Sequence, residues 1–307
     1  MTTPKRPPGR FGDAPSTPER RGAPLPMVTQ PMIPTSDHER SDQTRVDHPL
    51  ASLKPETAAV LFGKPTTSMA MVAQAKPQLQ TLAHAGPPPE IGLTQHHFPD
   101  EELDHRLTLM LDPDSERAAA FRVLRHHLLE IGRPQCVVVS SPRPGDGKTT
   151  TAVNLALALA ECGRAKVLLV ETHLRRPQLA AIFKLVPPWC FAEQLAAHRN
   201  QPMMPWSLVD IPQLWLHVAA INPRIEQTQL LDGPAFAIAM ERLRLGGYDH
   251  IVIDAPPVLG SADVNLMADA ADAVILALRA RVTSTRDLRT AIDQLGAPKI
   301  AGTVLVQ

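Results

Sequence analysis

The sequence contains few aromatic residues, few cysteines and no long apolar run. Aromatic side chains make up 4% of its 307 residues, and Tyr248 is the only tyrosine. The three cysteines, Cys136, Cys162 and Cys190, are too few and too widely spaced for a disulfide framework or a zinc cluster. We therefore expect a reducing, cytoplasmic environment. No apolar run reaches the ~20 residues of a membrane span, and the basic first ten residues lack the apolar segment of a secretory signal.

The sequence also lacks an excess of charge of either sign. It has 31 basic and 31 acidic residues, so bulk electrostatics give no reason to expect nucleic acid as a partner. The sequence offers no basic patch and no C-terminal amphipathic helix, and we expect contact with a membrane only through a partner protein. A chain of this length holds one large domain or two small ones.

Proline is concentrated in the first third of the chain. Residues 1–100 hold 17 of the 32 prolines, and their apolar residues come in short, aperiodic groups. Such a segment cannot offset its conformational entropy by burying apolar surface. We predict a disordered tail over residues 1–102 and an ordered domain over residues 103–307. The tail serves either as a tether or as a partner-binding segment.

The most informative segment runs from Ser140 to Thr150. It follows the apolar run 136–139 and precedes an alanine- and leucine-rich segment, 151–161, that is typical of a helix. A strand, a glycine-containing loop ending in Gly-Lys-Thr and a helix form the layout of a phosphate-binding P-loop. Its backbone N–H groups and the helix N-terminus favour an anion. We expect ATP and Mg²⁺ to bind at Gly145, Asp146, Gly147, Lys148, Thr149 and Thr150, with Lys148 on the β- and γ-phosphates and Thr149 on the metal. The plain pattern has glycine where this chain has Pro142.

From residue 136 onward, strand and helix patterns alternate. The predicted strands cover 136–140, 167–171, 214–219, 250–254, 273–278 and 300–306. The predicted helices cover 118–129, 149–162, 191–197, 232–246, 262–269 and 284–296, the first of them started by the turn residues 112–115. Strands that are almost purely apolar suit a sheet covered on both faces. The sequence therefore predicts an α/β fold with a doubly wound, mostly parallel sheet, whose ligands bind at the carboxyl ends of the strands.

Two further strands end in carboxylates. The strand at 250–254 ends in Asp254, the layout in which an aspartate holds Mg²⁺ directly or through water. The strand at 167–171 ends in Glu171, followed by His173 and the basic pair Arg175 and Arg176. We expect both carboxylates to serve as metal ligands and, with Lys148, as catalytic groups.

Together these segments resemble the bacterial tyrosine kinase (BY-kinase) family. The resemblance covers residues 104–307 and rests on Ser-x-Arg-Pro-Gly-Asp-Gly-Lys-Thr-Thr, Leu-Arg-Arg-Pro and Ile-Asp-x-Pro-Pro. It implies a cytoplasmic protein that transfers phosphate from ATP to protein tyrosine or hydrolyses ATP. It also implies a membrane partner, a polysaccharide co-polymerase (chain-length determinant) of capsule and exopolysaccharide export. The wider group includes the MinD/ParA ATPases, whose signature lysine aligns with Arg143.

The chain departs from the family at several positions. The family's Asp-x-Asp falls on Glu171 and His173, and a shift of ~1 Å in a catalytic group can cost about 10²-fold in rate. Its Glu-x-x-Arg-x-x-Arg motif, which implies homo-oligomers, keeps Arg122 and Arg125 but has Ala119 in place of the glutamate. The family's asparagine after the last strand, which is associated with the catalytic base, falls near Val306, with Gln307 next. No tyrosine cluster follows, so a substrate tyrosine must lie in another chain.

These departures leave two alternatives beside an active kinase. One is a catalytically degenerate nucleotide-binding regulatory subunit. The other is a MinD/ParA-type positioning ATPase, which predicts ATP-dependent dimers.

Overall fold

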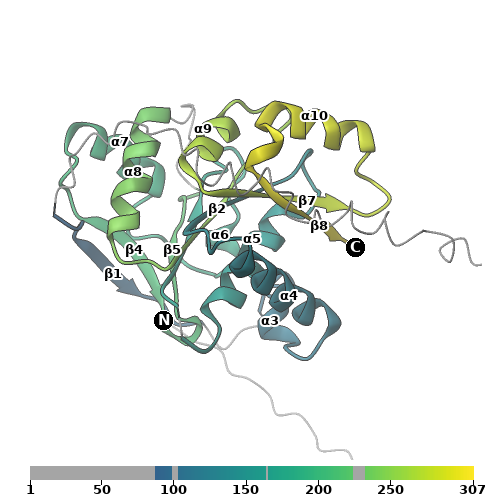
Figure 1. The fold of residues 1–307 in the computed structure, drawn as a ribbon. Coiled ribbons are helices and arrows are strands. Elements are labelled where there is room, and N and C mark those ends of the chain that lie inside the picture. Colours follow the sequence, from purple (N-terminus) through teal and green to yellow (C-terminus); the bar gives the residue numbers. More distant parts are fainter. Residues whose placement is uncertain (1–86, 99–102, 164, 224–231) are drawn as a thin grey trace, which may run out of the picture. The chain divides into compact units, whose positions relative to one another are not determined.

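The computed structural model describes residues 87–98, 103–163, 165–223 and 232–307. Figure 1 shows a central sheet with helices on both sides. Most of the predicted tail, residues 1–86, lies outside the described residues.

Eight strands form one sheet in the order β1-β4-β5-β3-β6-β2-β7-β8. All neighbouring strands are parallel except β4 and β5, which are antiparallel. The fold class predicted from the sequence is therefore confirmed. The strands are β1 Ile91–Gln95, β2 Cys136–Ser140, β3 Val167–Glu171, β4 Trp206–Ile211, β5 Leu216–Ala219, β6 His250–Asp254, β7 Ala273–Arg279 and β8 Ile300–Val306.

The helices lie between the strands and divide into two layers. They are α3 Thr108–Leu111, α4 Glu116–Glu130, α5 Lys148–Ala160, α6 Leu179–Ile182, α7 Phe191–Asn200, α8 Gly233–Leu245, α9 Asp263–Ala270 and α10 Thr285–Leu295, with 3-10 turns at Glu161–Gly163, Pro212–Leu214 and Ala297–Lys299. The first turn of α4 follows the predicted start signal, because the Ser115 side chain accepts a hydrogen bond from the Ala118 N–H.

Alternate residues of each central strand supply the two cores. Val137 and Val139 of β2 pack with α3, α4, α5 and α6 on one face of the sheet. Cys136 and Val138 of the same strand pack with α7, α8, α9 and α10 on the other face. Helices thus bury both faces of the central strands, as the uninterrupted apolar sequences of these strands predict.

Two strands were not predicted. The segment β1, Ile91–Gln95, pairs in parallel with β4 within the region predicted to be disordered, so the disorder prediction is wrong over these residues. Four of its five residues are exposed, which means that β1 has no buried face to produce a sequence pattern. Its partner β4 was also missed. The predicted strand at 214–219 begins only at Leu216, because Pro212–Leu214 forms a 3-10 turn.

Candidate nucleotide-binding site

The P-loop joins β2 to α5 as the sequence predicts. Gly145 and Gly147 have φ angles of +88° and +94°, a left-handed conformation that glycine adopts without strain. At Gly147 there is a second reason for glycine. A Cβ atom there would lie 3.0 Å from the side chain of Val306, at the end of β8. The two glycines therefore give the loop a backbone that other residues adopt only with strain, and Gly147 lies close to the last strand.

Side chains and backbone groups brace the start of this loop. The carboxylate of Asp146 is buried and accepts a hydrogen bond from the Arg143 N–H at 3.0 Å. The Ser141 hydroxyl donates to the Arg143 carbonyl at 2.7 Å. Pro142 stands where the plain motif has glycine, and its carbonyl accepts from the Leu259 N–H at 3.2 Å. Asp146 thus supports the loop from within, which is a structural contribution to the binding site.

Lys148, Thr149 and Asp254 meet at the carboxyl ends of β2 and β6. These strands are neighbours, with Val139 paired to Asp254. The Thr149 hydroxyl donates to Asp254 Oδ1 at 3.2 Å, and Lys148 Nζ lies 3.5 Å from the same hydroxyl. The second oxygen, Asp254 Oδ2, is buried without a hydrogen-bond partner. Burial raises the pKa of Asp254 to about 6, against the opposing effect of the Lys148 ammonium.

A buried carboxylate oxygen without a partner is costly unless a cation or a donor reaches it. Asp254 Oδ2 faces this situation beside a hydroxyl and an ammonium group. Oxygen ligands of this kind are those that Mg²⁺ prefers. The residues present therefore fit a magnesium nucleotide, and the predicted grouping of Lys148, Thr149 and Asp254 is found in the structure.

Glu171 lies next to Asp254 in the sheet but faces different partners. The two residues are paired in register between β3 and β6. The Glu171 carboxylate is fully buried, and both of its oxygens accept hydrogen bonds from the backbone. Oε1 accepts from the Gln178 N–H and, at 2.9 Å, from the Leu179 N–H. Oε2 accepts from the Ile221 N–H at 3.0 Å. Burial raises the pKa of Glu171 to about 7 in spite of these three donors. Glu171 is thus used to hold two loops at the edge of the site.

Three basic or ionisable side chains follow β3. His173 is partly buried, and its Nδ1 has no hydrogen-bond partner. Burial and the positive charges of Lys148, Arg176 and Arg175 lower the pKa of His173 to about 4. A neutral imidazole surrounded by cations marks a region of positive potential, which suits the phosphates of a nucleotide. Arg175 and Arg176 are exposed at its border.

Sequence reasoning missed three side chains that shape the site. The Thr172 hydroxyl donates to the Asp254 carbonyl at 2.9 Å and ties the ends of β3 and β6 together. Asn154 is fully buried and donates to the carbonyl of Thr150, a predicted ligand residue, at 2.8 Å. Asp287 binds Arg143, with Oδ2 at 2.7 Å from Nε. Only Asn154, a polar residue within an apolar helix, gives a signal in the sequence.

The arginines predicted to assemble oligomers have partners within the chain. Arg122 and Arg125 both bind Glu161, at 2.7 and 3.0 Å. Tyr248 is also engaged, since its hydroxyl lies 2.8 Å from His217 Nδ1 and the side chain is buried. A role for the two arginines between subunits stays a prediction, and Tyr248 is placed as a structural residue.

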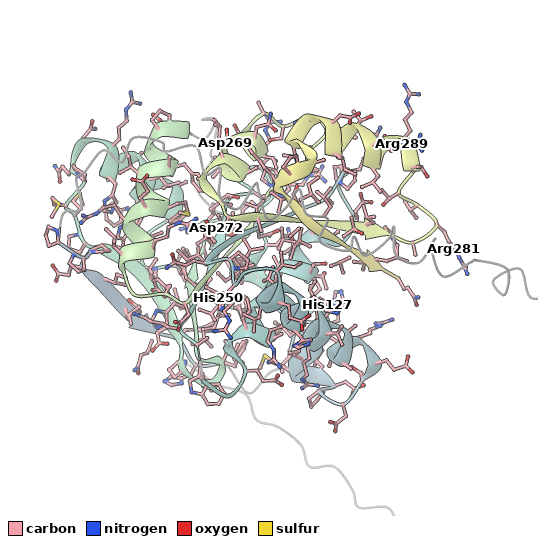
Figure 2. All side chains as sticks on the ribbon, in the orientation of Figure 1. His127, His250, Asp269, Asp272, Arg281 and Arg289 are labelled. Carbon is pink, nitrogen blue, oxygen red and sulfur yellow. The ribbon has the colours of Figure 1, made fainter. Side chains whose placement is uncertain are left out.

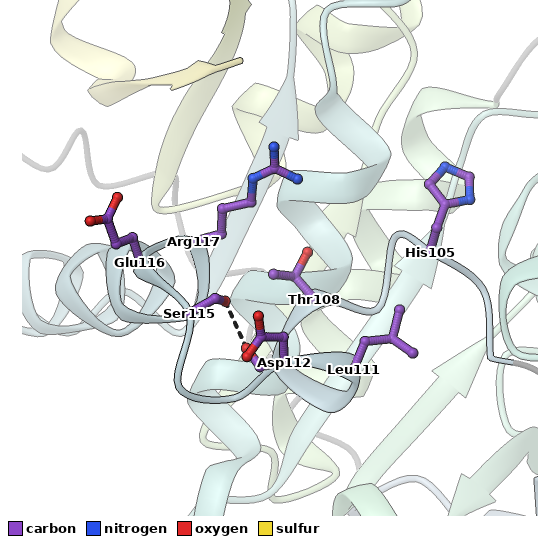
Figure 3. Close-up of a pocket in the computed structure, with 7 residues that line it drawn as sticks. All are labelled: His105, Thr108, Leu111, Asp112, Ser115, Glu116 and Arg117. Carbon is purple, nitrogen blue, oxygen red and sulfur yellow. Dashed lines mark hydrogen bonds between the residues drawn. The ribbon is translucent and has the colours of Figure 1, made fainter. Parts of the chain in front are cut away.

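A separate hollow lies between α3 and α4. Figure 3 shows its lining, in which the Ser115 hydroxyl bonds the Asp112 carbonyl. The residues around it are His105, Thr108, Leu111, Asp112, Ser115, Glu116 and Arg117. None of the predicted ligand residues belongs to this hollow, so the P-loop is the better candidate site.

Comparison with a known family decides the identity of the fold. The model of the ParA family, described as NUBPL iron-transfer P-loop NTPase, matches residues 133–300. This chain belongs to that family. Membership in a P-loop NTPase family implies a site for a nucleoside triphosphate, and the matched segment includes the loop, Lys148, Thr149 and Asp254. Within the described part of the chain, no group of three or more His, Cys, Asp or Glu side chains is placed to hold a metal ion.

Relatives within this P-loop group carry the names of tyrosine kinases. YwqD of Bacillus subtilis, a tyrosine-protein kinase, is 25% identical over 64% of this chain and 83% of its own length. EpsB of Ralstonia solanacearum, whose name assigns it to the same class, is 28% identical over 60% of this chain. The match spans only 24% of EpsB. The succinoglycan biosynthesis transport protein ExoP of Rhizobium meliloti is 25% identical over 63% of this chain and 25% of its own length.

A solved structure supports the same relationship. The kinase domain of VpsO superposes with a TM-score of 0.52 and 26% identity, over 62% of this chain and 96% of that domain. The resemblance to bacterial tyrosine kinases predicted from the sequence is therefore confirmed. Among the described residues, no helix has both the length and the apolar character needed to span a bilayer.

Proposed function

We propose that this protein binds ATP with Mg²⁺ and transfers phosphate to tyrosine residues of another protein in the synthesis and export of capsular polysaccharide or exopolysaccharide. The single observation that carries the proposal is the arrangement at Asp254. One oxygen of this buried carboxylate has no hydrogen-bond partner, and the other is bonded to Thr149, next to Lys148. Thr149 and Lys148 follow the P-loop, whose Gly145 and Gly147 have left-handed backbone conformations. The names of YwqD, EpsB and ExoP support the kinase activity and the polysaccharide context.

Each group of the site has a defined task in this proposal. The backbone of residues 145–150 holds the phosphates, and Lys148 neutralises the charge that develops on the transferred phosphoryl group. Thr149 and Asp254 hold Mg²⁺, which supplies electrostatic stabilisation of the phosphates when bound. Because such catalysis depends on positioning, the bracing of the loop by Asp146 contributes to it.

The acceptor tyrosine belongs to another chain. Tyr248 is the only tyrosine, and it is buried with its hydroxyl bound to His217. We propose a polysaccharide co-polymerase of the membrane as the partner that presents or activates the acceptor. In this arrangement the protein acts in the cytoplasm, at the inner face of the membrane, through its partner.

The first test replaces Lys148 with alanine in the full-length protein. We expect the affinity for ATP in the presence of Mg²⁺, measured by isothermal titration calorimetry, to fall by at least about 100-fold, since buried charge-assisted contacts are lost. The matched control is Lys299→Ala, a partly exposed lysine that pairs with Asp269. If Lys148→Ala binds ATP as tightly as the control does, the proposed site is wrong.

A second candidate function is that of a regulatory subunit with little catalytic activity. The observation that favours it is the state of Glu171, whose two oxygens are occupied by three backbone N–H donors. These three bonds leave about one of the four lone pairs of the carboxylate for a metal. The neighbouring His173 supplies no carboxylate in its place.

Single-turnover assays distinguish the two candidates. Glu171→Asp combined with His173→Asp restores the carboxylates of the related kinases. If the protein is degenerate, the wild type binds ATP without turnover, and the double substitution raises phosphate release. Robust phosphotransfer by the wild type would eliminate the regulatory alternative.

A further inference from the structure

Four exposed arginines follow one another closely in the sequence from the end of β7 to α10. Arg279 ends the strand, Arg281 lies in the following loop, and Arg286 and Arg289 lie on the outer side of α10; we call these four residues the basic rim. All four side chains are exposed, and none forms an ion pair within the described residues. Figure 2 shows Arg281 and Arg289 extending away from the fold. The balanced total charge of the chain conceals this local excess.

The basic rim borders the nucleotide site. β7 is the direct neighbour of β2, so Arg279 and the P-loop leave the same edge of the sheet. Two contacts connect them. Asp287 of α10 binds Arg143 of the P-loop at 2.7 Å. The Ala280 N–H donates to the Val306 carbonyl at 2.8 Å, and the Val306 side chain lies 3.0 Å from the position that a Cβ atom of Gly147 would take.

The fold itself makes no use of these four charges. α10 packs through Ala291 and Leu295, which lie on its opposite side. The acidic side chains of the helix neutralise the rim only in part: Asp287 pairs with Arg143 and also acts on the neighbouring Arg286, and Asp293 forms no ion pair within the described residues. Exposed arginines in excess over acidic side chains beside the nucleotide edge attract anionic groups and raise their local concentration.

We infer that the basic rim binds an acidic peptide segment of the protein that accepts the phosphate. This inference rests on the proposed function, because it names the chemistry of the acceptor. Guanidinium groups bind carboxylates in paired hydrogen bonds, which suits Asp- and Glu-rich sequences. A bilayer is a poorer fit, since Arg281 and Arg289 extend in different directions and not onto one plane beside the nucleotide edge (Figure 2). A narrow peptide leaves that edge open.

The test measures peptide binding to the full-length protein by fluorescence anisotropy. The probe is a fluorescein-labelled peptide with three glutamates on each side of one tyrosine, and a second probe has serine in place of glutamate. The test variant is R281E/R289E. The control variant is R117E/R133E, which reverses two exposed arginines outside the rim and changes the net charge equally. R281Q/R289Q removes the two charges without introducing repulsion.

We expect R281E/R289E to bind the acidic probe at least about tenfold more weakly than the wild type does. R281Q/R289Q is intermediate and R117E/R133E is unchanged. Raising the salt to about 0.5 M should weaken wild-type binding and remove most of the difference between the proteins. Melting temperatures and ATP affinities of all variants should match the wild type.

Two outcomes overturn the inference. One is equal affinity of R281E/R289E and the wild type for the acidic probe. The other is arginine-dependent binding to phosphatidylserine vesicles without binding of the probe, which would assign the rim to a membrane. Anisotropy requires no turnover, so a protein that binds the probe through the rim but does not bind ATP would refute the proposed function alone.

Discussion

Two neighbouring carboxylates show how much the role of a side chain depends on its partners. Asp254 and Glu171 end adjacent strands, and burial raises the pKa of both groups, to about 6 and about 7. Glu171 has its oxygens occupied by the backbone, whereas Asp254 keeps one oxygen without a partner. Burial is therefore common to both carboxylates, but their hydrogen bonds differ. Those of Glu171 restrain two loops, whereas the free oxygen of Asp254 is available to a cation.

The first prediction concerns the stability of Asp254→Asn. Because the pKa of Asp254 is raised, the folded protein keeps a proton between pH 3.8 and about 6 that the unfolded chain releases. The free energy of unfolding therefore falls as the pH rises through this window, and it stays lower at higher pH. Removing the ionisable group should raise the free energy of unfolding at pH 8 by on the order of 1–3 kcal/mol and change it little below pH 4. Urea denaturation without nucleotide measures this effect. The exposed Asp114→Asn serves as control, and a less stable Asp254→Asn protein at pH 8 would contradict the prediction.

The second prediction concerns the pH dependence of metal-assisted binding. Mg²⁺ requires the carboxylate form of Asp254, and burial raises the pKa of that group to about 6. The gain in ATP affinity that Mg²⁺ provides should therefore be full at pH 8 and fall about tenfold for each pH unit below 6. Calorimetric titrations at pH 5, 6, 7 and 8, with and without Mg²⁺, measure this gain. A gain that is constant across the series would exclude Asp254 as the metal ligand.

At the scale of elements, a charged cluster holds α4 against the end of α5. Arg122 and Arg125 of α4 both bind Glu161, which follows the last turn of α5. Arg125 also donates to the Ala158 carbonyl at 2.7 Å and so satisfies a free carbonyl of that turn. Since α5 begins at the P-loop, this cluster fixes the far end of the helix that carries Lys148.

The third prediction is that Glu161→Gln destabilises the protein by about 1 kcal/mol. The paired arginine contacts make this bridge stronger than an ordinary surface pair, but the side chains are only about 70% buried and water screens them. The comparison is with Glu130→Gln, an exposed glutamate that pairs with His126 on the surface of α4. Urea denaturation at low and high salt should show a difference that shrinks with salt. Equal stability of both variants at low salt would show that the cluster does not contribute.

The sequence predicts the central elements well and the sheet margin poorly. Strands β2, β3, β6 and β8 have the bounds expected from their apolar runs. β1 and β4 were missed because their strand character depends on pairing with each other, over 110 residues apart in the chain. Local composition carries no trace of such a contact.

The same distinction applies to the site. Lys148, Thr149 and Asp254 were predicted because short motifs specify them, and parallel strands bring motif ends to one edge. The hydrogen bonds of Glu171 were not predicted, because their donors are Gln178, Leu179 and Ile221. Only the folded chain places these amides around one carboxylate.

At the scale of the whole molecule, β1 sets the boundary between the tail and the domain. Its pairing with β4 is extended by the Trp206 N–H, which donates to the Glu90 carbonyl at 2.8 Å, and by the His96 N–H, which donates to Asp210 at 2.8 Å. The Arg242 side chain donates to the Pro87 carbonyl at 3.1 Å. These contacts indicate that the domain begins at about residue 87, earlier than the predicted 103.

The fourth prediction compares two truncations at this boundary. Removing residues 1–86 should leave the melting temperature unchanged, because the proline-rich composition gives that segment little apolar surface to bury. Removing residues 1–98 also takes away β1 and exposes the backbone edge of β4, so the melting temperature should fall by about 5 °C or more. Thermal unfolding followed by circular dichroism measures both. Equal melting temperatures for the two truncated proteins would show that β1 adds no stability to the sheet. A protein without residues 1–86 that melts below the untruncated protein would show that the tail stabilises the domain.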